Sequence, residues 1–111
     1  MRNISFSMTV PQIKARTKTV TRRQGWANVK AGDVLMAVEK AQGLKKGEKV
    51  QRLGPIRVID VREERIQDMT DADCVLEGFP ELTRIGFILM YCQANKCYAH
   101  HYCRRIEFEY V

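Results

Sequence analysis

Cationic and hydroxyl side chains are interleaved in one short stretch near the start of the chain, residues 14–23 (KARTKTVTRR). The stretch holds five Lys or Arg residues, three threonines and no acid. Threonine hydroxyls donate hydrogen bonds while Lys and Arg carry positive charge, so the combination suits phosphate oxygens. The candidate contacts to a nucleotide or nucleic acid are therefore Lys14, Arg16, Lys18, Thr19, Thr21, Arg22 and Arg23.

The excess of positive over negative charge is confined to the N-terminal third of the protein. Seven Lys and Arg residues precede Asp33, the first carboxylate, and the chain from Asp33 onward holds twelve basic and thirteen acidic side chains. The whole net charge of +6 thus comes from the first 32 residues. An anionic partner would explain this segregation. The alternative is a solvated basic face that later Asp and Glu residues neutralise in the folded protein.

Two further residues complete the candidate binding set. Trp26, the only tryptophan, follows a turn at Gly25, and its indole could stack on a base or pack in the core. Glu77 is expected as the last residue of a helix, where a carboxylate faces the negative pole and is mildly unfavourable. Because stability does not account for this placement, Glu77 is a functional candidate. The alternative is an exposed, solvated glutamate.

Three of the four cysteines lie close to two histidines, in the pattern C-x4-C-x2-HH-x-C. Cysteine and histidine are zinc ligands, so a Cys3His site could be drawn from Cys92, Cys97, His100 and Cys103. However, the pattern lacks a C-x2-C pair, and Cys92 is expected inside a helix. We therefore interpret the cysteines as buried or half-buried thiols, and we expect no metal and no cofactor.

Length and composition indicate one globular domain spanning residues 1–111. Hydrophobic residues make up 45% and charged residues 29% of the chain, which argues against disorder. The longest apolar run, residues 86–92, is far shorter than the roughly 18–20 residues of a membrane span. Residues 1–5 contain no secretory apolar region, so we expect a cytosolic protein without membrane contact and without disulfides. The sequence gives no indication of oligomeric state.

The elements that must position these residues follow from hydrophobic periodicity and turn signals. A capping box at Thr9 predicts a short helix to about Arg16, and the β-branched residues 17–21 predict an extended segment after it. A capping-box pattern at Thr70 and Asp73 predicts the start of a second helix, which ends at Gly78 and has its buried stripe on Ala72, Val75, Leu76 and Phe79. A third runs from Thr83 to about Ala94, with its stripe on Ile85, Ile88, Leu89 and Cys92.

Strands are predicted at residues 4–8, 34–38, 50–61 and 105–110, with a bulge or break at Gly54–Pro55. Apolar and charged residues alternate in the last of them, which predicts that Ile106, Phe108 and Tyr110 face inward. Glu63–Glu64 is predicted to be an exposed acidic turn and the internal partner of the basic residues. The order of elements, β-α-β-β-α-α-β, suggests a small mixed barrel decorated by helices.

In its motifs the sequence resembles the ASCH family, a branch of the PUA-like β-barrels, especially small stand-alone members from phage and bacterial genomes. The resemblance covers roughly residues 3–110 and rests on residues 18–23 (KTVTRR), Trp26, Gly32–Asp33, residues 77–79 (EGF) and residues 106–108 (IEF). It implies an α+β fold, a small mixed PUA-like β-barrel of about five to six strands flanked by two to three helices. It also implies a cleft beside the barrel and a role in binding RNA or another nucleic acid.

One branch of that family resembles an amidohydrolase that removes the acyl group from N4-acetylcytidine. The resemblance assigns its catalytic lysine, threonine and glutamate to Lys18, Thr21 and Glu77. The sequence departs from that branch at Arg22 and Arg23, after Glu77, and in a longer Cys/His segment.

Three interpretations of function follow. As an enzyme, Thr21 would attack an amide, Lys18 would act as its base if partly neutral, and Glu77 would pass a proton to the leaving amine. As a binding module, the cations would hold phosphates, a base would stack on an aromatic ring, and Glu77 would accept from an exocyclic amine. The binding module needs no lowered pKa and is the preferred interpretation. An interaction protein with an acidic partner is the third.

All of the site interpretations require Lys18 and Glu77, which are far apart in sequence, to meet at one hollow. The catalytic interpretation also requires a bend between Lys18 and Thr21, because side chains three residues apart on a straight strand point to opposite faces.

Overall fold

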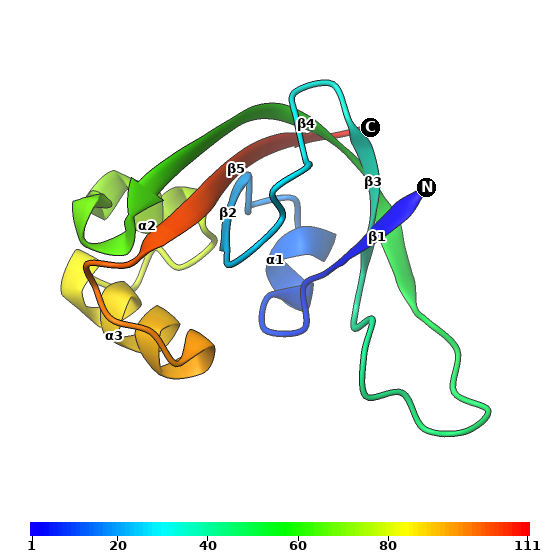
Figure 1. Ribbon diagram of the computed structural model, residues 1–111. Coiled ribbons are helices and arrows are strands. Elements are labelled where there is room, and N and C mark those ends of the chain that lie inside the picture. Colours follow the sequence, from blue (N-terminus) through cyan, green and yellow to red (C-terminus); the bar gives the residue numbers. More distant parts are fainter.

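In the computed structural model, which describes residues 1–111, the chain folds around one five-stranded mixed sheet (Figure 1). The strands are β1 (Arg2–Ser5), β2 (Val20–Arg23), β3 (Val34–Val38), β4 (Arg52–Arg65) and β5 (Tyr102–Tyr110). Their order in the sheet is β1-β3-β4-β5-β2; β1 and β3 are parallel and the other neighbours are antiparallel. The sheet curls into a half-barrel, so the predicted α+β barrel-like fold is confirmed.

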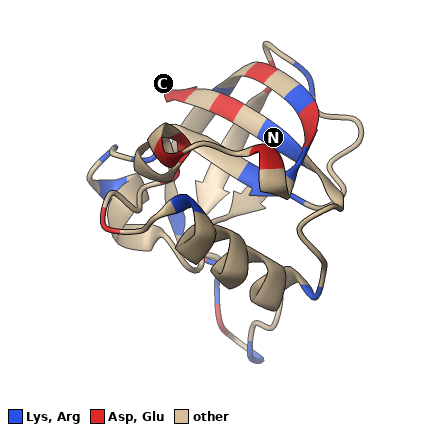
Figure 2. Ribbon diagram, turned by 90° about the vertical axis from the view of Figure 1, so that its left-hand side faces the viewer, with Lys and Arg blue, Asp and Glu red and all other residues tan.

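Three helices accompany the sheet: α1 (Val10–Lys14), α2 (Asp71–Leu76) and α3 (Arg84–Asn95), with a 3-10 turn, η1 (Ile66–Asp68), between β4 and α2. In Figure 1, α2 and α3 lie together at the end of the long strands, and α1 lies below the curled sheet near β2. Most of α3 is uncharged, as its tan colour in Figure 2 shows. None of these helices has both the length and the apolar character that crossing a bilayer requires.

The two longest strands, β4 and β5, pair from Ile56–Tyr110 to Arg65–Tyr102, and the Arg65–Tyr102 end of this pair lies next to α2 and α3 (Figure 1). The prediction of an exposed acidic turn at residues 63–64 is wrong, because β4 continues through both glutamates. Their cross-strand partners are Arg104 and Cys103 of β5, and the Glu63–Arg104 pair closes at 2.9 Å. Opposite charges on neighbouring strands favour continued pairing here.

The irregularity predicted at Gly54–Pro55 is present as a register shift between β3 and β4, opposite Ala37 and Val38. Gly54 has φ 132°, a conformation that side chains rarely adopt. Strand β1 is shorter and earlier than the predicted strand at residues 4–8 because the chain turns into α1 after Ser5.

The apolar interior is divided into two clusters. The first lies within the curled sheet and contains Ile4, Phe6, Ile13, Val29, Leu35, Ala37, Ile56, Val58, Ile106 and Phe108. The second lies beneath α2 and α3 and contains Ile66, Met69, Cys74, Phe87, Ile88, Tyr91 and Cys103. The alternation predicted for the last strand is confirmed at Ile106 and Phe108, which are both fully buried.

The predicted stripe of α2 is wrong. Val75 is 54% exposed and Leu76 is 36% exposed, whereas the buried side chains are Asp73 and Cys74. The helix turns its carboxylates inward because arginines on β2 and β5 face it, and buried charges need partners of opposite sign.

The predicted stripe of α3 is right at Ile88 and Cys92 and wrong at its other two positions. Phe87 and Tyr91 are buried, while Ile85 and Leu89 are more than half exposed. Burying two aromatic rings removes more apolar area from water than burying two aliphatic side chains, which fixes the rotation of the helix.

The predicted helix ends are mostly confirmed. Thr70 forms a complete capping box with Asp73, the side chain of Thr83 accepts from the Gly86 N–H, and Gly78 takes a positive φ of 92°. The capping box predicted at Thr9 is wrong, since its side chain makes no capping bond, and α1 ends at Lys14.

Candidate functional site

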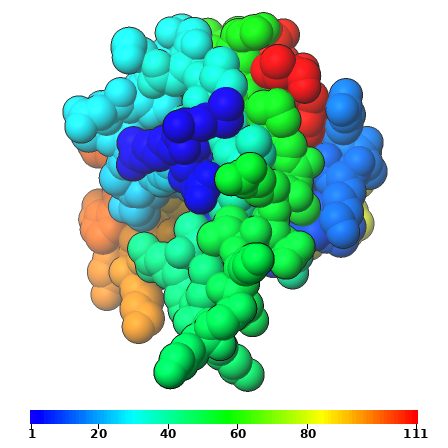
Figure 3. Space-filling model, turned by 90° about the vertical axis from the view of Figure 1, so that its right-hand side faces the viewer, coloured from blue at the N-terminus to red at the C-terminus, as the bar shows by residue number.

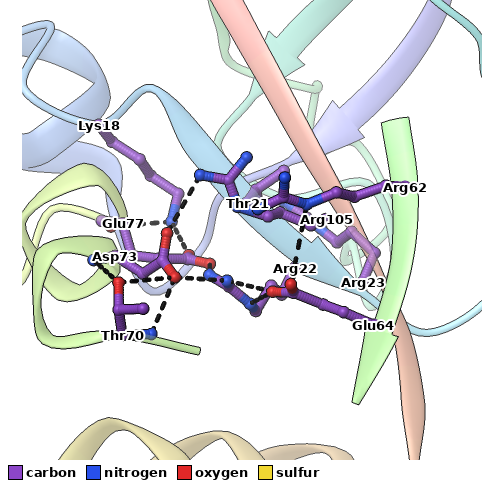
Figure 4. Close-up of polar contacts among 10 residues, drawn as sticks. All are labelled: Lys18, Thr21, Arg22, Arg23, Arg62, Glu64, Thr70, Asp73, Glu77 and Arg105. Carbon is purple, nitrogen blue, oxygen red and sulfur yellow. Dashed lines mark hydrogen bonds and ion pairs between the residues drawn. The ribbon is translucent and has the colours of Figure 1, made fainter. Parts of the chain in front are cut away.

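The ammonium group of Lys18 lies against Glu77, the residue that follows α2 and caps its C-terminus (Figure 4). Its Nζ donates to Glu77 Oε1 at 2.8 Å and to the Glu77 backbone oxygen at 2.9 Å. Only 4% of the Lys18 side chain and 3% of the Glu77 side chain are exposed. The predicted meeting of these residues, 59 positions apart, is therefore confirmed.

Backbone contacts hold Lys18 in place before β2 begins. The Thr19 N–H donates to the Leu76 oxygen of α2, the Phe108 N–H of β5 donates to the Thr19 oxygen, and the Tyr110 hydroxyl donates to the Lys18 oxygen. A β-carbon added to Gly78 would lie 2.8 Å from Gln12 Cγ and 3.4 Å from Lys18 Cβ. Glycine at position 78 thus permits the close approach of α1, α2 and the segment that carries Lys18.

Arg22 occupies the centre of a buried ion cluster. Its Nη1 lies 2.9 Å from Glu77 Oε2, and its Nη2 contacts Glu64 and lies 3.1 Å from Asp73 Oδ2. Arg105, directly opposite Arg22 on β5, lies 3.1 Å from Asp73 Oδ1. Three cations and three carboxylates balance in this ion cluster: Lys18, Arg22, Arg105, Glu64, Asp73 and Glu77.

The ion cluster explains the position of Glu77 at a helix C-terminus. Two buried cations contact its carboxylate, and Lys18 also satisfies its backbone oxygen, so the unfavourable pole is neutralised. Arg22 is fully buried with its guanidinium engaged by carboxylates, so it faces protein rather than solvent. The predicted role of Glu64 as an internal partner of the basic segment is thereby confirmed.

Burial and charge shift the pKa values of the ion cluster. Burial lowers the pKa of Lys18 below 10.5, the charges of Arg23 and Arg22 act in the same direction, and Glu77 opposes them. Burial disfavours the charge of Arg22, but Glu77, Glu64 and Asp73 outweigh it and raise the pKa of Arg22. Burial also disfavours the Asp73 carboxylate, yet the Thr70 N–H and both arginines lower its pKa below 3.8.

Beside the ion cluster lies a cleft of about 220 Å³ between the β1–α1 connection, β2 and the two later helices. Its polar wall is formed by Lys18, Thr21, Arg22, Arg23 and Glu77. Its apolar wall is formed by Phe79, Phe87, Met90 and Tyr91, and residues 5–9, Ala94 and Asn95 complete it. The rings of Phe79 and Phe87 meet edge to face at 5.8 Å, and Phe87 stacks on Tyr91 at 6.4 Å.

Arg23 is the cation of the cleft that has no carboxylate partner. Its Nε donates to Thr21 Oγ1 at 3.0 Å, its Nη2 donates to the Ser5 oxygen, and its guanidinium lies 4.9 Å from the Phe6 ring. Burial lowers the pKa of Arg23 to about 10. Since Nη1 makes no hydrogen bond within the protein, Arg23 retains donors for a ligand.

The remaining predicted site residues do not line the cleft. Lys14 and Arg16 are exposed, and the Arg16 guanidinium lies 5.5 Å from the Tyr110 ring. Thr19 contributes backbone hydrogen bonds only. Trp26 packs against the first apolar cluster, with the Arg2 guanidinium 3.9 Å above its ring.

The sequence reasoning missed the aromatic wall and one acid of the ion cluster, Asp73. Phe87 and Tyr91 are four residues apart in a predicted helix, which is a signal for a shared face. Asp73 was noted only as a capping residue, and nothing local marks it as the partner of two arginines.

The Cys/His segment does not assemble a metal site. Cys103 is buried in the second apolar cluster, Cys92 and Cys97 pack against that cluster, and all four cysteines are free. His100 stacks on Tyr98 at 5.9 Å in the turn before β5. No three Cys, His, Asp or Glu side chains come close enough to one another to hold a metal ion.

The fold and cleft together define a small α+β half-barrel protein with a ligand-sized site where the sheet meets its helices. No protein-family model and no curated protein matches the sequence. Among solved structures, an ASCH domain from Lactobacillus crispatus JV V101 is similar, with a TM-score of 0.62 and 11% identity over 98% of this chain and 78% of that chain.

A protein of the DUF984 family from Enterococcus faecalis V583 is similar as well, with a TM-score of 0.64 and 16% identity. That likeness covers 99% of this chain and 79% of the other. The chain therefore has an ASCH-type fold, as the resemblance in sequence implied. At these identities the likeness extends to the fold alone.

Proposed function

We propose that the cleft binds a single nucleobase, carried by RNA or by a nucleotide. The observation that supports this proposal is a small cleft with an aromatic wall on one side and a wall of donors and a carboxylate on the other. Its volume of about 220 Å³ is below the roughly 300–1,000 Å³ typical of pockets for drug-sized ligands. One base with its sugar is therefore the appropriate size of ligand.

The two walls have complementary roles in this proposal. Phe79, Phe87 and Tyr91 offer apolar and aromatic surface to the face of a base, as in single-stranded RNA recognition. Glu77 accepts a hydrogen bond from an exocyclic amine, since each carboxylate oxygen can accept more than one. Arg23 donates to a base carbonyl or ring nitrogen. Such ligands occur in the cytoplasm, the compartment that the sequence favours.

Filling the cleft tests the proposal without disturbing the ion cluster. Ala94 is an exposed residue of α3 that lines the cleft, and Gln93 beside it is exposed and does not. We expect Ala94→Trp to weaken binding of the preferred nucleoside or its monophosphate at least tenfold, and Gln93→Trp to leave it unchanged, by calorimetry with all four bases. Absence of binding to every base, or equal binding by both variants, would refute the proposal.

A second candidate function, amide hydrolysis, is favoured by one observation: Lys18, Thr21 and Glu77 line the same cleft, and burial lowers the pKa of Lys18. Thr21 accepts from Arg23, so its own hydroxyl proton is free for a base. No hydrogen bond joins Thr21 to Lys18 in the structure, and for that reason binding is the leading proposal.

In this second proposal the Thr21 oxygen attacks the acyl carbon and its proton passes to neutral Lys18. Lys18 hands that proton to Glu77, with which it is hydrogen bonded, and Glu77 passes it to the leaving amine as the C–N bond breaks. Water then hydrolyses the acyl-threonine, which releases a carboxylic acid and restores the Thr21 hydroxyl. Incubation with N4-acetylcytidine should release cytidine, measured by chromatography. Thr21→Val should abolish release and Thr19→Val should preserve it; equal rates in the two variants would exclude Thr21 as the nucleophile.

A further inference from the structure

A second hollow, of about 540 Å³, lies next to the cleft and shares Ser5, Ser7 and Arg23 with it. Its other lining residues are Arg2, Asn3, Trp26, Lys40, Ala41 and Gln42. The N-terminal residues that contribute to it lie at the surface on the side shown in Figure 3, in dark blue. Because three residues line both hollows, the two hollows adjoin each other.

No acid lines the second hollow, and three cations do: Arg2, Arg23 and Lys40. Arg2 and Arg23 form no ion pair, whereas Arg22 and Arg105 of the same protein are matched by carboxylates. Lys40 lies 3.5 Å from Glu48, but both side chains are largely exposed and such pairs are weak. The hollow is therefore a region of uncompensated positive charge that favours an anion.

The polar groups around these cations are those that bind phosphate. Ser5, Ser7 and Asn3 can donate to phosphate oxygens, and the guanidinium groups can donate two parallel hydrogen bonds to them. Trp26 also lines this hollow, with the Arg2 guanidinium 3.9 Å above its ring, and bases of single strands stack on guanidinium planes as well as on aromatic rings. Phosphate binding and base stacking therefore come together beside a cleft of the size of one nucleoside.

We propose that the second hollow binds the phosphate and the adjacent nucleotide of a ligand whose base occupies the cleft. The protein then binds nucleotides of a single-stranded chain in preference to free nucleosides. Arg23, which lines both hollows, contacts the phosphate that joins the two nucleotides. This inference rests on the proposed binding of a base in the cleft and adds the class of ligand.

The charge of Arg2 allows a matched test. Arg2→Met removes the charge and keeps a long side chain over Trp26, and Arg16→Met makes the same change at an exposed arginine near Tyr110, outside both hollows. Calorimetry compares each nucleoside with its 5′- and 3′-monophosphates and with trinucleotides of RNA and DNA. We expect a monophosphate to bind at least tenfold more tightly than its nucleoside, and a trinucleotide more tightly still.

Arg2→Met should weaken binding of the phosphorylated ligands about tenfold and leave the nucleoside unchanged, since one charge-assisted hydrogen bond is lost. For the trinucleotide, the slope of log K against log salt should flatten by about 0.7, the value for one phosphate of a single strand. Arg16→Met should match the unmodified protein.

The outcomes separate this inference from the proposed function. If a nucleoside and its monophosphates bind equally, or if Arg2→Met and Arg16→Met behave alike, the inference is wrong while binding of a base in the cleft stands. If a trinucleotide binds no more tightly than a monophosphate, the adjacent nucleotide has no site. If no nucleoside and no nucleotide binds, both proposals fail.

Discussion

Removing one charge from the buried Lys18–Glu77 pair should destabilise the protein more than removing both. The two side chains are nearly inaccessible to solvent and lie 2.8 Å apart within an ion cluster of three cations and three carboxylates. Glu77→Gln leaves Lys18 without a carboxylate, while Arg22 retains Glu64 and Asp73. Breaking a buried pair in this way costs about 3–5 kcal/mol, because an uncompensated charge stays buried.

Lys18→Met should lower the free energy of unfolding less than Glu77→Gln does. Lys18→Met leaves Glu77 with Arg22, so the expected loss is about 3 kcal/mol, at the lower end of the same range. The double variant restores the balance of charges, and replacing a buried pair with uncharged side chains is often close to neutral, so we expect a loss of about 2 kcal/mol or less. The coupling free energy between the two positions should therefore be about 4 kcal/mol or more.

Urea unfolding at pH 7, followed by circular dichroism and by the fluorescence of Trp26, measures these free energies. Comparison requires equal m-values, because a change in m would indicate a change in the surface exposed on unfolding. If the double variant loses the sum of the two single losses, the pair is not coupled, and the account of the ion cluster given above is wrong.

Three other predictions concern the frame of the site. Gly78→Ala should cost about 1–3 kcal/mol in urea unfolding, because position 78 has positive φ and the added carbon meets Gln12; an unchanged midpoint would contradict this. Burial raises the pKa of Cys103 from 9.0 to about 11, so the folded state keeps a proton that the unfolded state loses, and stability should fall as pH rises from about 9 to 11. Cys103→Ala should remove that part of the pH dependence, and an identical profile would count against it. Phe87→Ala should cost about 3–5 kcal/mol, and Leu89→Ala, on the exposed face of α3, less than about 0.5 kcal/mol in the same assay; similar losses would show that the rotation of the helix is wrong.

Sequence patterns predicted correctly those helices and strands whose buried faces consist of apolar side chains. The strand at Val34–Val38 and the inward side chains Ile106 and Phe108 followed from alternation, and the start of α2 at Thr70 followed from its capping box. The buried stripe predicted for α2 was wrong because periodicity assumes that the apolar face of a helix is the buried one, although the helix itself is present as predicted. Here the buried face carries Asp73, whose partners are arginines on distant strands.

Part of the site was also predicted, but from a resemblance to a protein family rather than from hydrophobic periodicity. The meeting of Lys18 with Glu77 depends on the packing of α2 against β2, which no local pattern encodes; it was inferred from resemblance to a family of proteins. Glu64 was predicted as a partner of the basic residues, but in a turn rather than a strand, and neither Asp73 as a second partner nor Arg22 as the cation they neutralise was predicted. Trp26 was predicted in the site from its residue type; it does not line the cleft but lines the second hollow.

The half-barrel leaves its two outer strands, β1 and β2, without a backbone ladder between them. A closed barrel joins its first and last strands along such a seam by main-chain hydrogen bonds. In this protein a single side chain spans the seam, since Arg23 of β2 donates to the carbonyl oxygen of Ser5 in β1. An anion that competes for this guanidinium would therefore affect both edge strands of the sheet at once. Amide hydrogen exchange in β1 would then change when the site is occupied, even though the guanidinium belongs to β2.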